Sequence, residues 1–186
     1  MRFPASDRLH LPCRFSEYIP GRQHPDGRRY LPLLLFELDA ALWLGGTAPL
    51  LSVIDRHHRV DPADVGSFGA ARLVFLLSSI RLQPPPPLQG LLAEPACAGG
   101  RPSSMPQAYG LVQSVDAWEV EQQHLSYQQL YTELVLAIGQ ATVGVRTSAT
   151  AADLAAQIGT NRITPMDPLC VMRSRIDILG FTREAT

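Results

Sequence analysis

The chain has 186 residues, and its 16 basic residues are all arginine, set against 17 acidic residues for a formal net charge of −1. Because lysine is missing, three classes are excluded for this chain acting alone: P-loop nucleotide hydrolases, pyridoxal phosphate enzymes and protein kinases, each of which needs a lysine. The composition, 46% hydrophobic and 18% charged, is typical of a globular protein.

The cysteines and the N-terminus bear on the compartment. The three cysteines are Cys13, Cys97 and Cys170. They lie far apart and form no Cys-x-x-Cys pair, which is typical of reduced thiols. No apolar signal segment follows Met1, and the longest apolar run, residues 31–44, contains Glu37 and Asp39. The sequence therefore predicts a bacterial, cytoplasmic protein with no membrane association.

The first half of the chain divides into two expected regions. Residues 1–30 carry six arginines against three acids and show no periodicity, which predicts an irregular basic N-terminal arm, either a partly disordered terminus or a nucleic-acid contact. Residues 31–83 are expected to be helical, with helices over 31–44, around 49–54 and over 62–82. The helix over 31–44 is apolar almost all round, so it lies in the core or meets a partner chain. Its Leu35 and Trp43 are candidate protein-interface residues.

The second half begins with a break. Residues 84–107 contain seven prolines and three glycines, which predicts a linker or long crossover loop. Residues 108–186 are again expected to be helical, although 109–118 fits a strand or the start of a helix equally well. A capping box at Ser126 begins the expected helix that ends near Ala141. Tyr127 and Tyr131 on this helix are further candidate interface residues.

The C-terminal region contains a short expected helix over 151–158, closed by Gly159, then a polar turn and a second expected helix over 165–179. This pattern resembles the helix-turn-helix of bacterial DNA-binding domains. The resemblance implies DNA contact through Arg162, Thr164, Arg173 and Arg175. Two positions of the second helix that should be apolar hold proline, so a plain helical hairpin that completes the core is the alternative.

The densest polar cluster spans residues 55–61. Asp55, His57, His58 and Asp61 are side chains of the types that bind divalent metals or act as general bases. The spacing of a helical zinc site is absent, because adjacent histidines on a helix diverge. A solvated helix end is the alternative interpretation of the same residues.

Together these patterns predict a mainly α protein, a helical bundle-like core with a long Pro-rich crossover loop and little β structure. The favoured function is a non-catalytic helical adaptor that binds a protein partner or forms a homodimer. A DNA-binding regulator that uses residues 151–180 is the first alternative, and a small metal-dependent enzyme around Asp55–Asp61 is the second. No cofactor is predicted, and a divalent metal is the one cofactor that the pattern allows.

Overall fold

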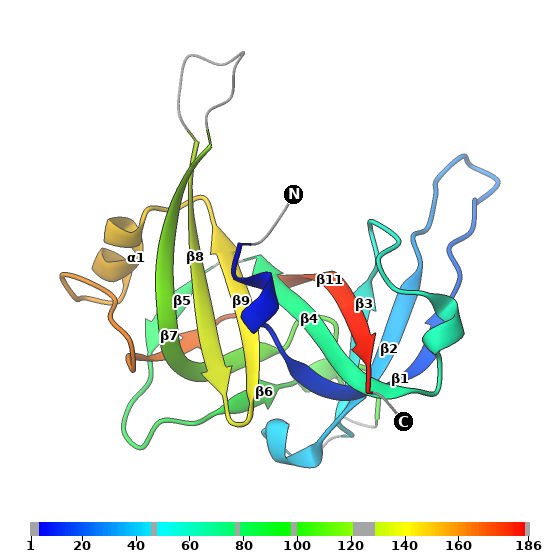
Figure 1. The fold of residues 1–186 in the computed structure, drawn as a ribbon, viewed down its shortest axis with the longest axis horizontal. Helices are drawn as coiled ribbons and strands as arrows, with labels where there is room; N and C mark the ends of the chain where they lie inside the picture. The colour runs from blue at the N-terminus through cyan, green and yellow to red at the C-terminus, as the bar shows by residue number, and fades with distance from the viewer. Residues whose placement is uncertain (1–3, 46–47, 77–78, 98–99, 121–128, 185–186) are drawn as a thin grey trace.

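The computed structural model describes residues 4–45, 48–76, 79–97, 100–120 and 129–184 (Figure 1). In these ranges the chain forms eleven strands, four short 3-10 helices and one α-helix. The strands are β1 (Leu11–Ile19), β2 (Leu33–Leu38), β3 (Leu50–Ile54), β4 (Phe68–Leu76), β5 (Ile80–Leu82), β6 (Gly90–Leu92), β7 (Gln107–Val120), β8 (Gln129–Ile138), β9 (Ala141–Thr147), β10 (Pro168–Val171) and β11 (Arg175–Arg183). The helices are η1 (Pro4–Arg8), η2 (Ala40–Leu42), η3 (Pro62–Asp64), η4 (Pro95–Cys97) and α1 (Ala151–Gln157).

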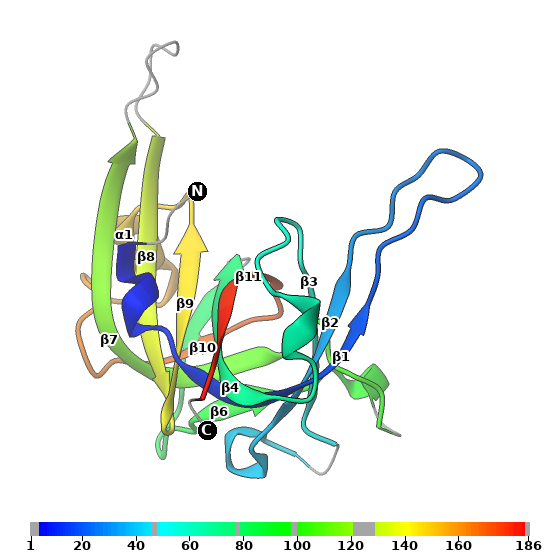
Figure 2. The same cartoon turned by 45° about the vertical axis from the view of Figure 1, so that its right-hand side comes forward.

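Strand β4 joins two groups of strands into one sheet. The order is β3-β2-β1-β4-β9-β8-β7-β10-β5, with β11 on β4 and β6 on β7. The first half of β4 pairs with β1 and its last residues pair in parallel with β9, while β11 follows nearly its whole length. Because a strand has only two edges, β1 and β9 share one edge of β4 and β11 takes the other. Figures 1 and 2 show β1–β3 on one side of β4 and β7–β9 on the other.

The core is continuous across both groups of strands, since one cluster of buried apolar side chains contains residues from each. Three aromatic rings meet where β1, β2 and β11 pack together. The ring centroid of Phe15 lies 5.3 Å from that of Phe36 and 5.8 Å from that of Phe181. Phe15 and Phe36 are fully buried. Burying a side chain of this size contributes about 1.5–3 kcal/mol, so these rings fix how β1, β2 and β11 pack.

The predicted helical bundle is wrong, because most of the expected helices are strands. Residues 31–44 form β2 and the short η2, residues 49–54 contain β3, and residues 62–82 contain η3, β4 and β5. In β2, Leu34, Phe36 and Leu38 are buried while the residues between them are less so, which is the alternation of a strand. Leucine favours helices, but here packing on the sheet decides the conformation.

The expected helices over 126–141 and 165–179 are also wrong. The part of the first that the structure describes forms β8 and the start of β9, and the second is replaced by β10 and β11. Residues 132–136 of β8 are all buried, so both faces of the strand are covered. A strand covered on both faces has a continuous apolar sequence, which periodicity alone does not distinguish from a buried helix.

The short helix at the C-terminal side is confirmed as α1. Its N-cap Thr150 accepts a hydrogen bond from the Asp153 N–H, and the Asp153 carboxylate accepts one from the Thr150 N–H. The open choice over 109–118 is resolved as a strand, β7. Residues 84–107, predicted to be a linker or loop, include β6, which pairs with β7. In the described ranges, no helix has the length and apolarity that crossing a bilayer requires.

Candidate functional site

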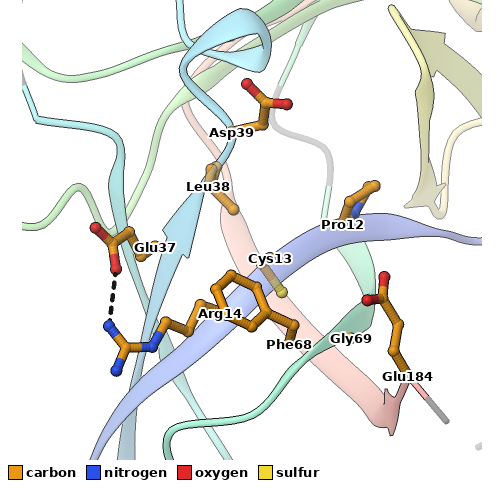
Figure 3. A pocket seen from close by; sticks show the side chains of 9 residues that line it. All are labelled: Pro12, Cys13, Arg14, Glu37, Leu38, Asp39, Phe68, Gly69 and Glu184. Carbon is orange, nitrogen blue, oxygen red and sulfur yellow. Dashed lines mark ion pairs between the residues drawn. The ribbon is translucent and has the colours of Figure 1, made fainter. Parts of the chain in front are cut away.

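A cavity of about 520 Å³ lies where β1 runs between the end of β2 and the start of β4 (Figure 3). We call it the acidic cavity; its described lining is Pro12, Cys13, Arg14, Glu37, Leu38, Asp39, Phe68, Gly69 and Glu184. The sheet register brings these segments together, since Cys13 lies opposite both Leu38 on β2 and Gly69 on β4. This volume is within the range of small-molecule sites.

The apolar wall of the acidic cavity is the ring of Phe68, which is 65% exposed and is the first residue of β4. The neighbouring Gly69 allows β4 and β11 to approach closely, because a Cβ there would lie 2.2 Å from the Thr182 carbonyl oxygen. The Glu184 N–H donates to the Phe68 carbonyl oxygen at 3.0 Å. This backbone contact fixes Glu184 beside the first residue of β4.

Carboxylates outnumber cations in this cavity. Arg14 Nη1 lies 3.6 Å from Glu37 Oε2, which balances one of the three acidic side chains. Asp39 is held as the N-cap of η2: its Oδ1 accepts from the Ala41 N–H at 2.9 Å, and its Oδ2 accepts from Gln140 Nε2 at 3.3 Å. Within the described residues, neither Asp39 nor Glu184 has a cationic partner. The cavity therefore carries an excess of negative charge at neutral pH.

Cys13 lies at the base of the acidic cavity and is 6% exposed. Burial raises the pKa of its thiol to about 12, and a hydrogen bond with the backbone of Ala71 opposes the rise only in part. The thiol is therefore protonated at neutral pH, whereas nucleophilic attack needs the thiolate. The described lining contains no histidine and no hydroxyl side chain. The arrangement suits non-covalent binding of a cation.

The residues of the predicted metal site do not meet around a common point. The Asp55 carboxylate is 1% exposed and accepts hydrogen bonds from the N–H groups of His57, Arg59 and Val60. Asp61 instead caps η3 through the Ala63 N–H. Among the described residues, no group of three or more His, Cys, Asp or Glu side chains is placed to hold a metal ion. Metal binding at residues 55–61 stays a prediction, and Asp55 has a structural role that spacing did not indicate.

The predicted helix-turn-helix is wrong, because the described segment after α1 contains a loop and β10 where the second helix was expected. Arg162 and Thr164 lie in that loop, Arg173 lies between β10 and β11, and Arg175 begins β11. The Arg175 guanidinium lies 3.5 Å from an Asp177 carboxylate oxygen. A regulator that reads DNA with a second helix is thereby overturned, and nothing in the structure tests DNA contact by these four side chains.

The predicted helical adaptor is overturned as well, since the two helices that were to carry its interface are strands. Leu35 is half-buried on β2, and Trp43, 7% exposed, belongs to the core. Tyr131 lies on β8 opposite Trp118 of β7. Tyr127 lies outside the described residues.

The residues of the acidic cavity were not singled out as a site by sequence reasoning. Glu37 and Asp39 appeared only as interruptions of an apolar run, and Phe68 as part of an expected helix. One sequence pattern does point to this region. Glu37 is the one charged residue within the apolar segment 33–38, and this pattern fits a strand that ends at the edge of a sheet.

No family model, curated protein or solved structure matched this chain.

Proposed function

We propose that the protein binds a small organic cation, a ligand with a protonated amine or guanidinium group, in the acidic cavity. The observation that carries this proposal is the described lining of one cavity of about 520 Å³, which combines an exposed Phe68 ring with three carboxylates and a single guanidinium. A cavity that holds excess negative charge beside an aromatic face complements a cation with an apolar body.

Two contacts would hold such a ligand. The N–H groups of the cation donate charge-assisted hydrogen bonds to Asp39 and Glu184, which have no cationic partner among the described residues. The ligand's cationic group also lies near the face of Phe68, where it gains about 0.5–1 kcal/mol at an exposed site. Arg14 pairs with Glu37 in the same cavity, so among the described lining residues the charges of Asp39 and Glu184 are left for a ligand.

The chemistry of the lining favours binding without catalysis. Its one thiol, that of Cys13, is protonated at neutral pH because burial raises its pKa to about 12. The cavity therefore offers charge and an apolar surface without a thiolate nucleophile.

Calorimetry tests this function. The full chain is titrated at low ionic strength with n-butylammonium and, in a separate titration, with the neutral analogue 1-butanol. The key variant is Asp39→Asn with Glu184→Gln, since asparagine keeps the N-cap of η2 while the charge is lost. Glu17→Gln is the control, because it removes an exposed carboxylate on β1 that does not belong to the described cavity lining.

We expect n-butylammonium to bind to the wild type and to Glu17→Gln equally, and 1-butanol to bind much more weakly. Each exposed carboxylate contributes about 0.2–1 kcal/mol, so the double variant should lose about two- to thirtyfold in affinity. Equal binding of the amine and the alcohol, or an unchanged double variant, would contradict the proposal.

A further inference from the structure

A second cavity, of about 360 Å³, lies at the opposite end of the β1–β2 ladder from the acidic cavity. We call it the basic cavity. It lies at the connection between β1 and β2, whose residues 21–30 are all exposed and which Figure 2 shows standing away from the sheet. It is lined by Arg22, Arg29, His58, Tyr18 and Tyr30 among others, and none of its described lining residues is acidic.

The two arginines of the basic cavity have charges that are not neutralised nearby. Within the described residues, no ion pair or side-chain hydrogen bond engages the guanidinium of Arg22 or Arg29. Arg28 differs, because its Nε lies 3.5 Å from Asp26 Oδ2 at the tip of the same connection and it does not line the cavity. Two guanidinium groups in one concave site with no lining carboxylate form a site for an anion.

The backbone of the connection keeps these two arginines close. Gln23 and Arg29 form an antiparallel bridge, and the Tyr30 N–H donates to the Arg22 carbonyl oxygen at 2.8 Å. The approach is so close that a Cβ on Gly21 would lie 2.3 Å from the Tyr30 carbonyl oxygen. Arg22 and Arg29 are therefore brought together by a narrow two-stranded arm.

His58 reaches the basic cavity from a loop that Asp55 organises. The buried Asp55 carboxylate accepts hydrogen bonds from the N–H groups of His57 and Arg59, on either side of His58. The Asp55 N–H donates to the Pro32 carbonyl oxygen at 2.9 Å. His58 has φ +50°, in the left-handed region that few residues other than glycine adopt. The loop thus places an exposed imidazole beside the arginines from a distant part of the chain.

We infer that the basic cavity binds the phosphate group of a phosphorylated ligand through Arg22, Arg29 and His58. Each planar guanidinium donates two parallel hydrogen bonds to phosphate oxygens, and an imidazole N–H of His58 donates another. Tyr18 and Tyr30 line the same cavity, and each carries a hydroxyl group that is able to donate a hydrogen bond. The phosphate can belong to a small metabolite or to the backbone of a single-stranded nucleic acid, and the experiment separates these sources.

The test measures binding of the full chain to three probes at low ionic strength: inorganic pyrophosphate, a ten-nucleotide deoxythymidine strand, and a glutamate peptide of matched negative charge. The key variant is Arg22→Gln with Arg29→Gln, and Arg28→Gln is the control on the same arm. His58→Asn is a third variant, because asparagine tolerates the left-handed backbone. Unchanged circular dichroism would confirm that each variant folds.

We expect at least one phosphate probe to bind, with affinity about tenfold weaker in the double variant, about two- to fivefold weaker in His58→Asn and unchanged in Arg28→Gln. Pyrophosphate binding as tight as that of the strand indicates a small phosphorylated ligand, whereas markedly tighter binding of the strand indicates a nucleic-acid backbone. The inference is overturned if neither phosphate probe binds, if the glutamate peptide binds equally well, or if the double variant matches Arg28→Gln.

Discussion

Arg14 and Phe68 lie directly opposite each other across the β1–β4 ladder, and Arg14 also lies opposite Glu37 across the β1–β2 ladder. The one arginine of the acidic cavity therefore lies between an exposed aromatic ring and the carboxylate that it pairs with. An added ligand cation meets the remaining carboxylates while Arg14 repels it.

Replacement of Arg14 by glutamine should strengthen cation binding. The change removes the one positive charge among the described lining residues and leaves Glu37 without its ion-pair partner. Because an exposed pair is worth about 0.2–1 kcal/mol, we expect n-butylammonium to bind about two- to fivefold more tightly, as measured by calorimetry. Unchanged or weaker binding in this variant would contradict the proposed function.

Phe68→Ala should weaken cation binding without a large loss of stability. The ring is 65% exposed, so it contributes little to the core, but it forms the apolar wall of the cavity. We expect about a two- to fivefold loss of affinity for n-butylammonium, which is the size of a solvent-exposed cation–π contact. Leu88→Ala, at another exposed apolar residue outside the lining, is the control and should bind as the wild type does.

Cys13→Ala should leave cation binding within about twofold of the wild type, because a protonated, buried thiol contributes no charge. The same burial should protect Cys13 from alkylation by iodoacetamide at pH 8 in the folded protein. After unfolding in urea, the thiol should react. Peptide mapping by mass spectrometry measures both states. Rapid labelling of native Cys13, or loss of binding in the alanine variant, would show that the thiol takes part in the site.

Stability and its pH dependence should reveal a buried ion pair between β8 and β9. Arg146 Nε donates to Glu133 Oε1 at 2.7 Å, while Glu133 is 3% exposed and its Oε2 has no hydrogen-bond partner among the described residues. Burial raises the pKa of Glu133, and Arg146 opposes that rise. The folded state therefore holds this proton more tightly than the unfolded chain, so stability falls as pH rises through the folded-state pKa.

Arg146→Met should cost about 3–5 kcal/mol at neutral pH, because it leaves a buried carboxylate without its partner. Part of this loss should be recovered as pH is lowered through the raised pKa of Glu133, where the carboxyl becomes neutral. Urea denaturation at several pH values measures the effect, with Arg183→Met in an exposed pair with Asp64 as control. A loss below 1 kcal/mol, or one independent of pH, would show that the pair is well solvated.

Helix α1 could be predicted from sequence because its signals are local. Thr150, Asp153 and Gly159 lie within ten positions, and together they define a capping box and a left-handed stop, with φ +74° at Gly159. The strands lack such signals. Both faces of β8 are covered, so its sequence lacks the alternation of apolar and polar residues that marks a strand. The sequence therefore fits a buried helix equally well.

The acidic cavity could not be predicted because its residues meet only through strand pairing. Cys13, Leu38 and Gly69 are distant in sequence and become neighbours only once the order of β2, β1 and β4 is known. The cluster at residues 55–61 was visible because it is contiguous. The carboxylate of Asp55 in this cluster nevertheless accepts hydrogen bonds from backbone N–H groups. The sequence alone does not distinguish that role from metal binding.

The most direct test of cation binding in the acidic cavity is two-dimensional NMR of the isotope-labelled full chain during titration with n-butylammonium. We expect saturable shifts confined to the backbone amides of Arg14, Asp39, Gly69 and Glu184, with no comparable change on titration with 1-butanol. Shifts that are absent, that do not saturate, or that spread over acidic side chains outside the cavity would contradict the account.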